Sequence, residues 1–154
     1  HHETTQMMLE HLLEVELRGK SVLDMGCGTG VLAILAALRG ASPIDAVDID
    51  HWSFLNAREN TILNNQAHIH VYEGDVGFLK DQKYHLILAN INRNILLKDI
   101  PAYALHLEEN GMLMLSGFYQ DDLSQISEIC AETGLKYLRK SIKNNWVAAV
   151  YRIS

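Results

Sequence analysis

An aspartate followed by three closely spaced glycines is the first pattern in this sequence that could hold a small polar ligand. Asp24 is followed by Gly26, Gly28 and Gly30. Glycines let the backbone turn sharply and let a ligand approach main-chain atoms. A dinucleotide-binding loop has its third glycine three residues after the second, where this sequence has Val31. The spacing therefore departs from a pyrophosphate-binding loop, and the carboxylate of Asp24 suits a ligand with an ammonium group, held directly or through water. A plain turn is the alternative.

Three further polar side chains follow later strands. Asp48 ends the second expected strand, where a carboxylate can accept hydrogen bonds from both hydroxyls of a ribose; Asp50 is the better candidate for capping the next helix. Asp75 is a candidate acceptor for the amino group of adenine, and an Asx-turn is the alternative. Asn90 ends the fourth expected strand, at the central edge of the sheet. It is our candidate catalytic residue because an asparagine there can orient an incoming amine; a simple strand end is the alternative.

Helical and strand patterns alternate along the chain and place these polar residues at the ends of strands. The expected helices are 5–17, 31–39, 51–64, 95–107 and 121–132. The expected strands are 21–25, 44–48, 69–72, 84–89, 112–116, 135–142 and 146–153. This alternation predicts a mostly parallel sheet with helices on both faces, closed by an antiparallel hairpin around 143–145. We therefore expect one α/β domain over residues 1–154, with a Rossmann-like fold and a seven-stranded sheet.

Two local patterns add detail to these elements. Trp52, Leu55 and Ile62 recur in the helix at 51–64, and we expect them to face the core. The Asn110-Gly111 pair predicts a turn before the fifth strand.

The overall composition excludes several classes of protein. Hydrophobic residues make up 48% and charged residues 21% of the chain, which is typical of a folded globular domain. The net charge of -6 indicates no basic surface, so we expect no direct nucleic-acid partner; the same charge suits a basic protein substrate. No apolar run approaches the length of a membrane span.

Cysteine and histidine usage indicates neither disulfides nor a metal. Cys27 lies in the glycine loop and Cys130 in a helical stretch, so we expect no disulfide framework and a cytoplasmic, reducing location. The eight histidines show no zinc-like spacing, and we expect no metal site. The sequence starts at His1 without a methionine, and we expect an upstream part to be absent from it.

The polar residues above, taken in order, resemble those of the class I S-adenosylmethionine-dependent methyltransferases. The matching segments are 23–30, 47–50 and 74–75. A closer resemblance, to the bacterial ribosomal protein L11 methyltransferases, is carried by segments 2–5, 88–91, 116–117 and 146–148. That resemblance covers the chain from Glu3 to its end.

The resemblance implies a class I methyltransferase fold and S-adenosylmethionine as the cofactor, with contacts from Thr5, Gly26, Asp48 and Asn90. Thr5 would cap a helix that folds over the methionine part of the cofactor, and an ordinary N-cap is the alternative. The implied reaction is methylation of amino groups, on lysine side chains and an N-terminus, of ribosomal protein L11. This ribosomal protein is therefore the expected partner.

Two features depart from that family and leave the substrate open. Members of the family have an upstream domain that grips the ribosomal protein, and nothing in this sequence corresponds to it. The family also tends to have an apolar residue at the position of Asn92. The sequence itself gives no oligomeric state.

Methyl transfer from a sulfonium mainly requires alignment of a neutral amine. No residue is a compelling general base, so we expect Asn90 to position the amine and solvent to accept its proton. The alternatives are a class I methyltransferase for another protein, a nucleic acid or a small molecule, a nicotinamide oxidoreductase, and a non-catalytic cofactor-binding module. Enzymes for exocyclic amines have prolines and an aromatic after the asparagine, where this chain has Ile91-Asn92-Arg93. Val31 disfavours the oxidoreductase.

Overall fold

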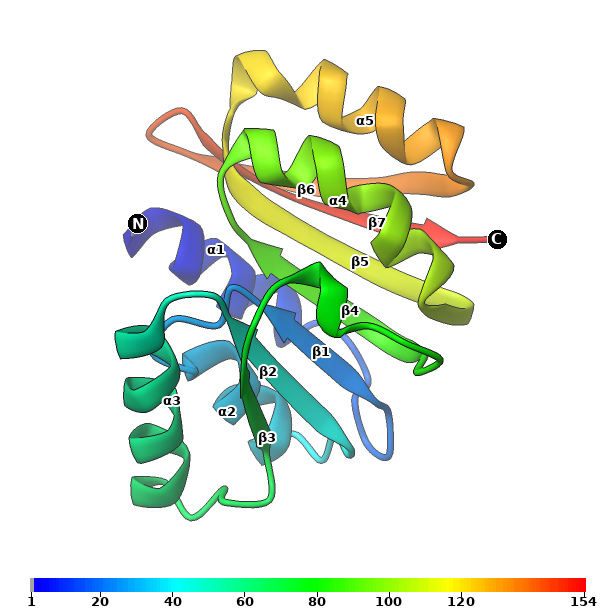
Figure 1. Ribbon diagram of the computed structural model, residues 1–154. Coiled ribbons are helices and arrows are strands. Elements are labelled where there is room, and N and C mark those ends of the chain that lie inside the picture. The colour runs from blue at the N-terminus through cyan, green and yellow to red at the C-terminus, as the bar shows by residue number, and fades with distance from the viewer. Residues whose placement is uncertain (1) are drawn as a thin grey trace.

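A seven-stranded sheet with the order β3-β2-β1-β4-β5-β7-β6 organises this computed structural model, which describes residues 2–154 (Figure 1). The strands are Val22–Met25 (β1), Ile44–Asp48 (β2), His70–Glu73 (β3), Tyr84–Asn90 (β4), Leu107–Tyr119 (β5), Leu135–Lys143 (β6) and Trp146–Ile153 (β7). Strands β1 to β5 are parallel, and β7 runs antiparallel between β5 and β6. The order of the strands reverses at β1 and β4, so the carboxyl ends of these two strands form the switch point where ligands bind in such sheets. The predicted fold class is confirmed.

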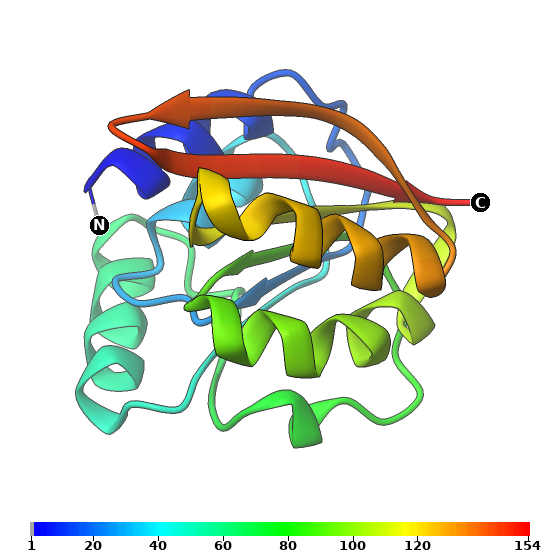
Figure 2. The same cartoon turned by 90° about the horizontal axis from the view of Figure 1, so that it is seen from above.

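Helices cover both faces of the sheet. They are His2–Leu12 (α1), Val31–Leu38 (α2), His51–Leu63 (α3), Arg93–Leu105 (α4) and Leu123–Glu132 (α5), with short 3-10 turns at Val76–Phe78 and Gln120–Asp122. Helices α4 and α5 lie side by side on one face (Figure 2). Leu86 and Leu88 of β4 pack into the core on the α1 and α2 side, whereas Ile87 and Ala89 pack toward α4 and α5. This two-sided burial explains the uninterrupted apolar run in β4.

Several predicted boundaries are wrong. Helix α1 spans His2–Leu12 rather than 5–17, α4 spans Arg93–Leu105 rather than 95–107, and α5 begins at Leu123 rather than at Asp121. Strand β5 runs through Asn110, where we expected a turn to precede it. The left-handed φ of 63° at Asn110 coincides with a register shift of β5 against β4, so the turn signal marks an irregularity within one long strand.

The expected inward face of α3 is also wrong. Trp52 is 75% exposed, Ile62 is 61% exposed and Leu55 is 38% exposed, whereas Ala57 is fully buried. The reason is the close approach of α3 to the glycine loop, since a Cβ atom at Gly30 would lie 3.5 Å from the Cβ of Ala57. Only small side chains fit such a contact, so the large apolar residues of this helix face outward.

The predicted hairpin is confirmed and holds α1 in place. Asn144 and Asn145 both have left-handed φ values, 50° and 70°, as a two-residue type I′ turn requires. The ammonium of Lys143 donates a 2.6 Å hydrogen bond to Oε1 of Gln6, and Asn144 donates to the carboxylate of Glu3. The carboxyl-terminal strands therefore position the amino-terminal helix.

A buried histidine adds a pH-dependent contact between α1 and β6. His11 Nε2 and Ser141 Oγ lie 2.8 Å apart. Burial lowers the pKa of His11, and the nearby charge of Arg139 lowers it further. Because the unfolded chain takes up this proton near a pH of about 6.5 and the folded chain only at a lower pH, we expect the free energy of unfolding to fall as the pH drops below about 6.5.

Chemical denaturation of wild type and His11→Gln at pH about 7.5 and about 5.5 measures this effect. The wild type should lose more stability on acidification than the variant, because the variant has no titrating group at this position. Equal losses in the two proteins would show that His11 does not contribute.

The helices of residues 2–154 include none that is both long and apolar enough to cross a membrane.

Candidate functional site

The glycine loop lies between β1 and α2, at the switch point of the sheet. The backbone amides of Gly26 and Cys27 both donate to the carbonyl of Val47 in β2, at 2.8 and 3.0 Å. Gly26 has a φ of 72°, and a Cβ atom there would come within 2.8 Å of Cγ1 of Ile91. Gly28 and Gly30 follow in the same turn, with Gly30 at the N-cap of α2. The loop is therefore held against the ends of both neighbouring strands.

Asp48 is held at the end of β2 with its carboxylate toward the glycine loop. The amide of Gly28 donates a 2.9 Å hydrogen bond to Oδ2 of Asp48, and the amide of Asp50 donates to Oδ1. Asp50 itself caps α3, accepting from the amide of Ser53, as we expected. Each oxygen of Asp48 retains lone pairs that could accept from the hydroxyls of a ligand.

Asp24 is a buried carboxylate without a hydrogen-bond partner. Its exposure is 0%, and neither of its oxygens is hydrogen-bonded within residues 2–154. Burial raises the pKa of Asp24 to about 7. The nearby amide of Ala33 lowers this pKa, although it makes no hydrogen bond of normal geometry, and the charge of Asp48 raises it. An orphaned buried carboxylate is costly, so this group fits a ligand that brings a positive charge to the loop.

A cavity of about 250 Å³ brings together four of the eight predicted binding residues, whereas Thr5, Asp24, Gly28 and Gly30 are not part of its lining. Its lining includes Gly26, Asp48, Asp75 and Asn90. One oxygen of Asp75 accepts a 2.8 Å hydrogen bond from the amide of Gly77. The Asx-turn that we weighed as the alternative is therefore present, and it leaves lone pairs of the Asp75 carboxylate for a ligand.

Asn90 lies at the end of β4, in register with Ser116 of β5. Its side-chain amide donates to Oγ1 of Thr5 in α1, at 3.5 Å. Two residues that were each predicted to contact the cofactor, Thr5 and Asn90, are thus brought together although they lie 85 positions apart in the sequence. The expectation that Thr5 caps a helix is wrong, because α1 already begins at His2 and Thr5 lies inside its first turns.

The segment after Asn90 is clamped between two glycines. Gly117 has a φ of 102°, and a Cβ atom there would lie 2.1 Å from the carbonyl oxygen of Ile91. The amide of Ile91 donates to the carbonyl of Ser116 at 3.1 Å. A Cβ atom at Gly26 would meet the side chain of Ile91, so the residue after Asn90 is closely packed at both its backbone and its side chain.

Replacement of Gly117 by alanine should therefore displace the segment that carries Asn90. We expect a loss of turnover of about a hundredfold, since a displacement of about 1 Å at a reacting group costs that much. Gly19→Ala is the matched control, because Gly19 also has a left-handed φ, of 71°, but nothing within 4 Å of an added Cβ atom. Turnover of both variants with thermal unfolding alongside measures the difference; similar turnover in the two would contradict a specific role for the Gly117 contact.

A second concave surface lies at the starts of α4 and α5 and begins two residues after Asn90. Its volume is about 450 Å³, and its lining includes Asn92, Arg93, Tyr119, Asp122 and Trp146. The rings of Tyr119 and Trp146 lie against each other, with 4.1 Å between their centroids. Asn92 caps α4 by accepting from the amide of Ile95, which accounts for a polar residue at this position.

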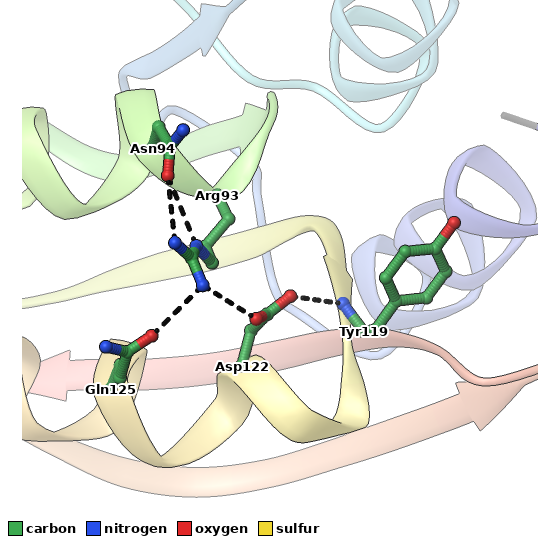
Figure 3. A network of polar contacts seen from close by, with 5 residues as sticks. All are labelled: Arg93, Asn94, Tyr119, Asp122 and Gln125. Carbon is green, nitrogen blue, oxygen red and sulfur yellow. Dashed lines mark hydrogen bonds and ion pairs between the residues drawn. The ribbon is translucent and has the colours of Figure 1, made fainter.

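Arg93 connects the two helices that border this groove (Figure 3). Its Nη1 donates to Oδ1 of Asp122 at 3.2 Å and to Oε1 of Gln125 at 3.3 Å, while Nε and Nη2 donate to the side-chain oxygen of Asn94. The other oxygen of Asp122 accepts from the amide of Tyr119. The network therefore fixes the start of α4, directly after Asn90, to the end of β5.

Two polar side chains of the cavity were not predicted from the sequence. Asp99 and Tyr103 of α4 line the same cavity as Asp48 and Asp75. Their spacing of one helical turn shows only that they share a face of α4; which face meets the cavity depends on how the helix packs.

Other expectations concern metals and cysteines. Across residues 2–154, no cluster of three or more histidine, cysteine, aspartate or glutamate side chains is arranged to hold a metal ion. Cys27 and Cys130 are both buried free thiols.

The chain is similar to known proteins along its whole length. A family model described as "Ribosomal protein L11 methyltransferase" matches residues 1–153. The ribosomal protein L11 methyltransferase of Phocaeicola vulgatus is 47% identical over 98% of this chain and 54% of its own length. That of Porphyromonas gingivalis is 50% identical over 96% of this chain and 51% of its own. The chain thus spans about half the length of these curated relatives.

Solved structures give the same result for the fold. The crystal structure of a ribosomal protein L11 methylase from Lactobacillus delbrueckii subsp. bulgaricus superposes with a TM-score of 0.89 at 31% identity, over 100% of this chain and 81% of that chain. Magnesium protoporphyrin IX methyltransferase from Synechocystis superposes with a TM-score of 0.77 at 21% identity, over 95% of this chain and 76% of that chain, a likeness of fold alone. The fold is that of the class I methyltransferases.

Proposed function

The chain belongs to the family of ribosomal protein L11 methyltransferases, and from that premise we propose that its cavity binds S-adenosylmethionine and that Asn90 presents an amine for methylation. The observation that supports this most is Asp24, a fully buried carboxylate without a hydrogen bond in the described chain. It lies directly before the glycine loop, which also borders the cavity that Asn90 lines. The methionine ammonium of the cofactor is the positive group that this carboxylate lacks.

Each part of the cofactor has a matching group in the chain. Asp24 holds the ammonium, directly or through water, and the glycine loop from Gly26 to Gly30 lies along the rest of the methionine part. Asp48 accepts from the ribose hydroxyls with the lone pairs left free by its two backbone contacts. Asp75 accepts from the amino group of adenine. When bound, the cofactor supplies a methyl group that its sulfonium already activates.

Asn90 acts on the incoming amine. Its side-chain amide donates to Thr5, which turns the side-chain oxygen toward an N–H of the substrate. Together with the backbone carbonyl, this oxygen orients the amine lone pair in line with the methyl group. The amine must be neutral to react, and solvent accepts its proton. The aromatic groove formed by Tyr119 and Trp146 includes Asn92, two residues after Asn90, and it is the path by which the amine arrives.

We assign the methylation of amino groups of ribosomal protein L11, on lysine side chains and the N-terminus, to this site. The net charge of -6 suits a basic protein substrate. Such a substrate places the reaction in the cytoplasm. The domain over residues 1–154 carries the cofactor and the transfer step, and we assign no further docking surface for the ribosomal protein to it.

Calorimetric titration with S-adenosylhomocysteine, and with NADH as the parallel control, tests the proposal. We expect binding of the first and not of the second. Transfer of a labelled methyl group to purified ribosomal protein L11 then tests the substrate. Binding of NADH alone would contradict our interpretation of the glycine loop. Binding of S-adenosylhomocysteine without methyl transfer to ribosomal protein L11 would support the cofactor site and contradict the assigned substrate.

A further inference from the structure

One wall of the cofactor cavity carries a hydroxyl that the folded chain leaves without a partner. Tyr103 is fully buried, and its hydroxyl makes no hydrogen bond to any of the residues described. The side chain lines the cavity of about 250 Å³, together with Asp99 one helical turn earlier. Buried hydroxyls in native proteins are nearly always hydrogen-bonded, so this one indicates a ligand group that meets it in the cavity.

Asp99 and Tyr103 offer an adjacent acceptor and donor. Burial raises the pKa of Tyr103, and the charge of Asp99 raises it further, so its hydroxyl keeps its proton for donation. Asp99 is 7% exposed, and this burial is the main cause that raises its pKa. The charge of Lys98 lowers the pKa of Asp99, and the charge of Asp75 raises it. A ligand group that donates to Asp99 would relieve the effects of burial and of the Asp75 charge.

Adenine presents the complementary pair on its edge, an amino group that donates next to a ring nitrogen that accepts. We propose that Asp99 and Tyr103 read this edge, with the Asp99 carboxylate accepting from the exocyclic amino group and the Tyr103 hydroxyl donating to the neighbouring ring nitrogen. This assignment rests on the proposed function, and it makes α4 a determinant of nucleobase specificity.

The geometry around Asp75 explains why a second acceptor is needed. One of its oxygens already accepts from the amide of Gly77, and the two hydrogens of an adenine amino group point in different directions, so one carboxylate does not reach both. Asp99, which lines the same cavity, supplies the acceptor for the second hydrogen. The two carboxylates then hold the amino group from both sides, and a base with a carbonyl at this position would face two acceptors.

Titrations with S-adenosylhomocysteine and with S-inosylhomocysteine test the assignment. In the inosine analogue a carbonyl replaces the amino group and the neighbouring ring nitrogen carries a hydrogen. We expect wild type to prefer the adenosine form by at least about tenfold, because the wrong base leaves buried groups unpaired. Asp99→Asn should narrow this preference, because its carboxamide can donate to the carbonyl of the inosine analogue.

Tyr103→Phe should weaken binding of S-adenosylhomocysteine by about tenfold. It should leave the unfolding temperature of the ligand-free protein unchanged or raised, because the lost hydroxyl has no partner there. Tyr151→Phe is the matched control: its buried hydroxyl lies 2.8 Å from Ser127 Oγ, and Tyr151 is not among the cavity residues. Its affinity for S-adenosylhomocysteine should equal that of wild type.

The outcomes separate this inference from the proposed function. Suppose that wild type binds S-adenosylhomocysteine, that Asp99→Asn prefers the adenosine form over the inosine form as strongly as wild type does, and that Tyr103→Phe binds S-adenosylhomocysteine as tightly as wild type does. In that case α4 does not recognise the base, and only this inference is overturned. If wild type binds neither analogue, the proposed function fails and the inference fails with it.

Discussion

Asp24→Asn is expected to lower the affinity for S-adenosylhomocysteine by thirtyfold to a hundredfold, about 2–3 kcal/mol, the range for a charged hydrogen bond lost in a buried site. The same substitution should stabilise the ligand-free protein. Asp24 is buried without a hydrogen bond in the described chain, so its negative charge opposes folding until a cationic ligand arrives. Opposite effects on binding and on stability would be difficult to obtain from a residue with a purely structural role.

The same residue makes binding depend on pH. Because the pKa of Asp24 is about 7 in the free protein, it is largely protonated below that pH, whereas the ligand ammonium requires the carboxylate. We expect the affinity of wild type to fall by up to tenfold for each pH unit below about 7, and the affinity of Asp24→Asn to stay nearly constant.

Stability should change in the other direction. The folded chain keeps a proton on Asp24 that the unfolded chain has already lost, so the contribution of Asp24 to stability is complete below the unfolded pKa of 3.8 and is lost as the pH rises to about 7.

Calorimetric titrations across this pH range, with denaturation curves at the same pH values, measure both effects. Asp81→Asn is the control for the loss of one negative charge, since Asp81 is exposed and not among the cavity residues. A wild-type affinity that is independent of pH, or an Asp24→Asn variant that binds as tightly as wild type, would refute the assignment of the ammonium to Asp24.

Asn90→Ala is expected to reduce turnover by a hundredfold to a thousandfold, with an affinity for S-adenosylhomocysteine only severalfold weaker. The estimate follows from the value of correct alignment in a reaction between two bound partners, where about 1 Å of misplacement costs about a hundredfold. Stability should change little, because the side chain of Asn90 is only partly buried and donates one long hydrogen bond, of 3.5 Å, to Thr5.

Single-turnover transfer to an amine substrate, measured with the cofactor saturating, separates this effect from binding. Asn64→Ala is a suitable control, because Asn64 is an exposed asparagine at the end of α3. Full turnover in Asn90→Ala would show that the amine is oriented by other groups. A loss confined to affinity would make Asn90 a cofactor ligand without a part in the transfer.

The sequence was most informative where function depends on the ends of strands. Asp24, Asp48 and Asn90 could be placed at one edge because alternating strands and helices require a parallel sheet, whose carboxyl ends meet. Asp50 could be assigned as a cap from its position before a helix. These inferences use only neighbours in the chain and one general rule of topology.

Contacts between distant elements could not be predicted in this way. The inward face of α3 is set by Ala57 against Gly30, and a pattern of large apolar residues pointed to the wrong side. Likewise, Tyr103 is an ordinary helix residue until the packing of α4 turns it toward the cavity. Hydrophobic periodicity indicates which residues avoid water, whereas close approach of backbones is decided by the smallest residues at each contact.

The position of Ile91 between Gly26 and Gly117 has a consequence for the order of events. We expect a shift of the glycine loop on cofactor binding to reach the backbone next to Asn90 through Ile91, since an added carbon at either glycine would collide with that residue. Whatever factor the cofactor then applies to the affinity for the amine, the amine applies the same factor to the affinity for the cofactor.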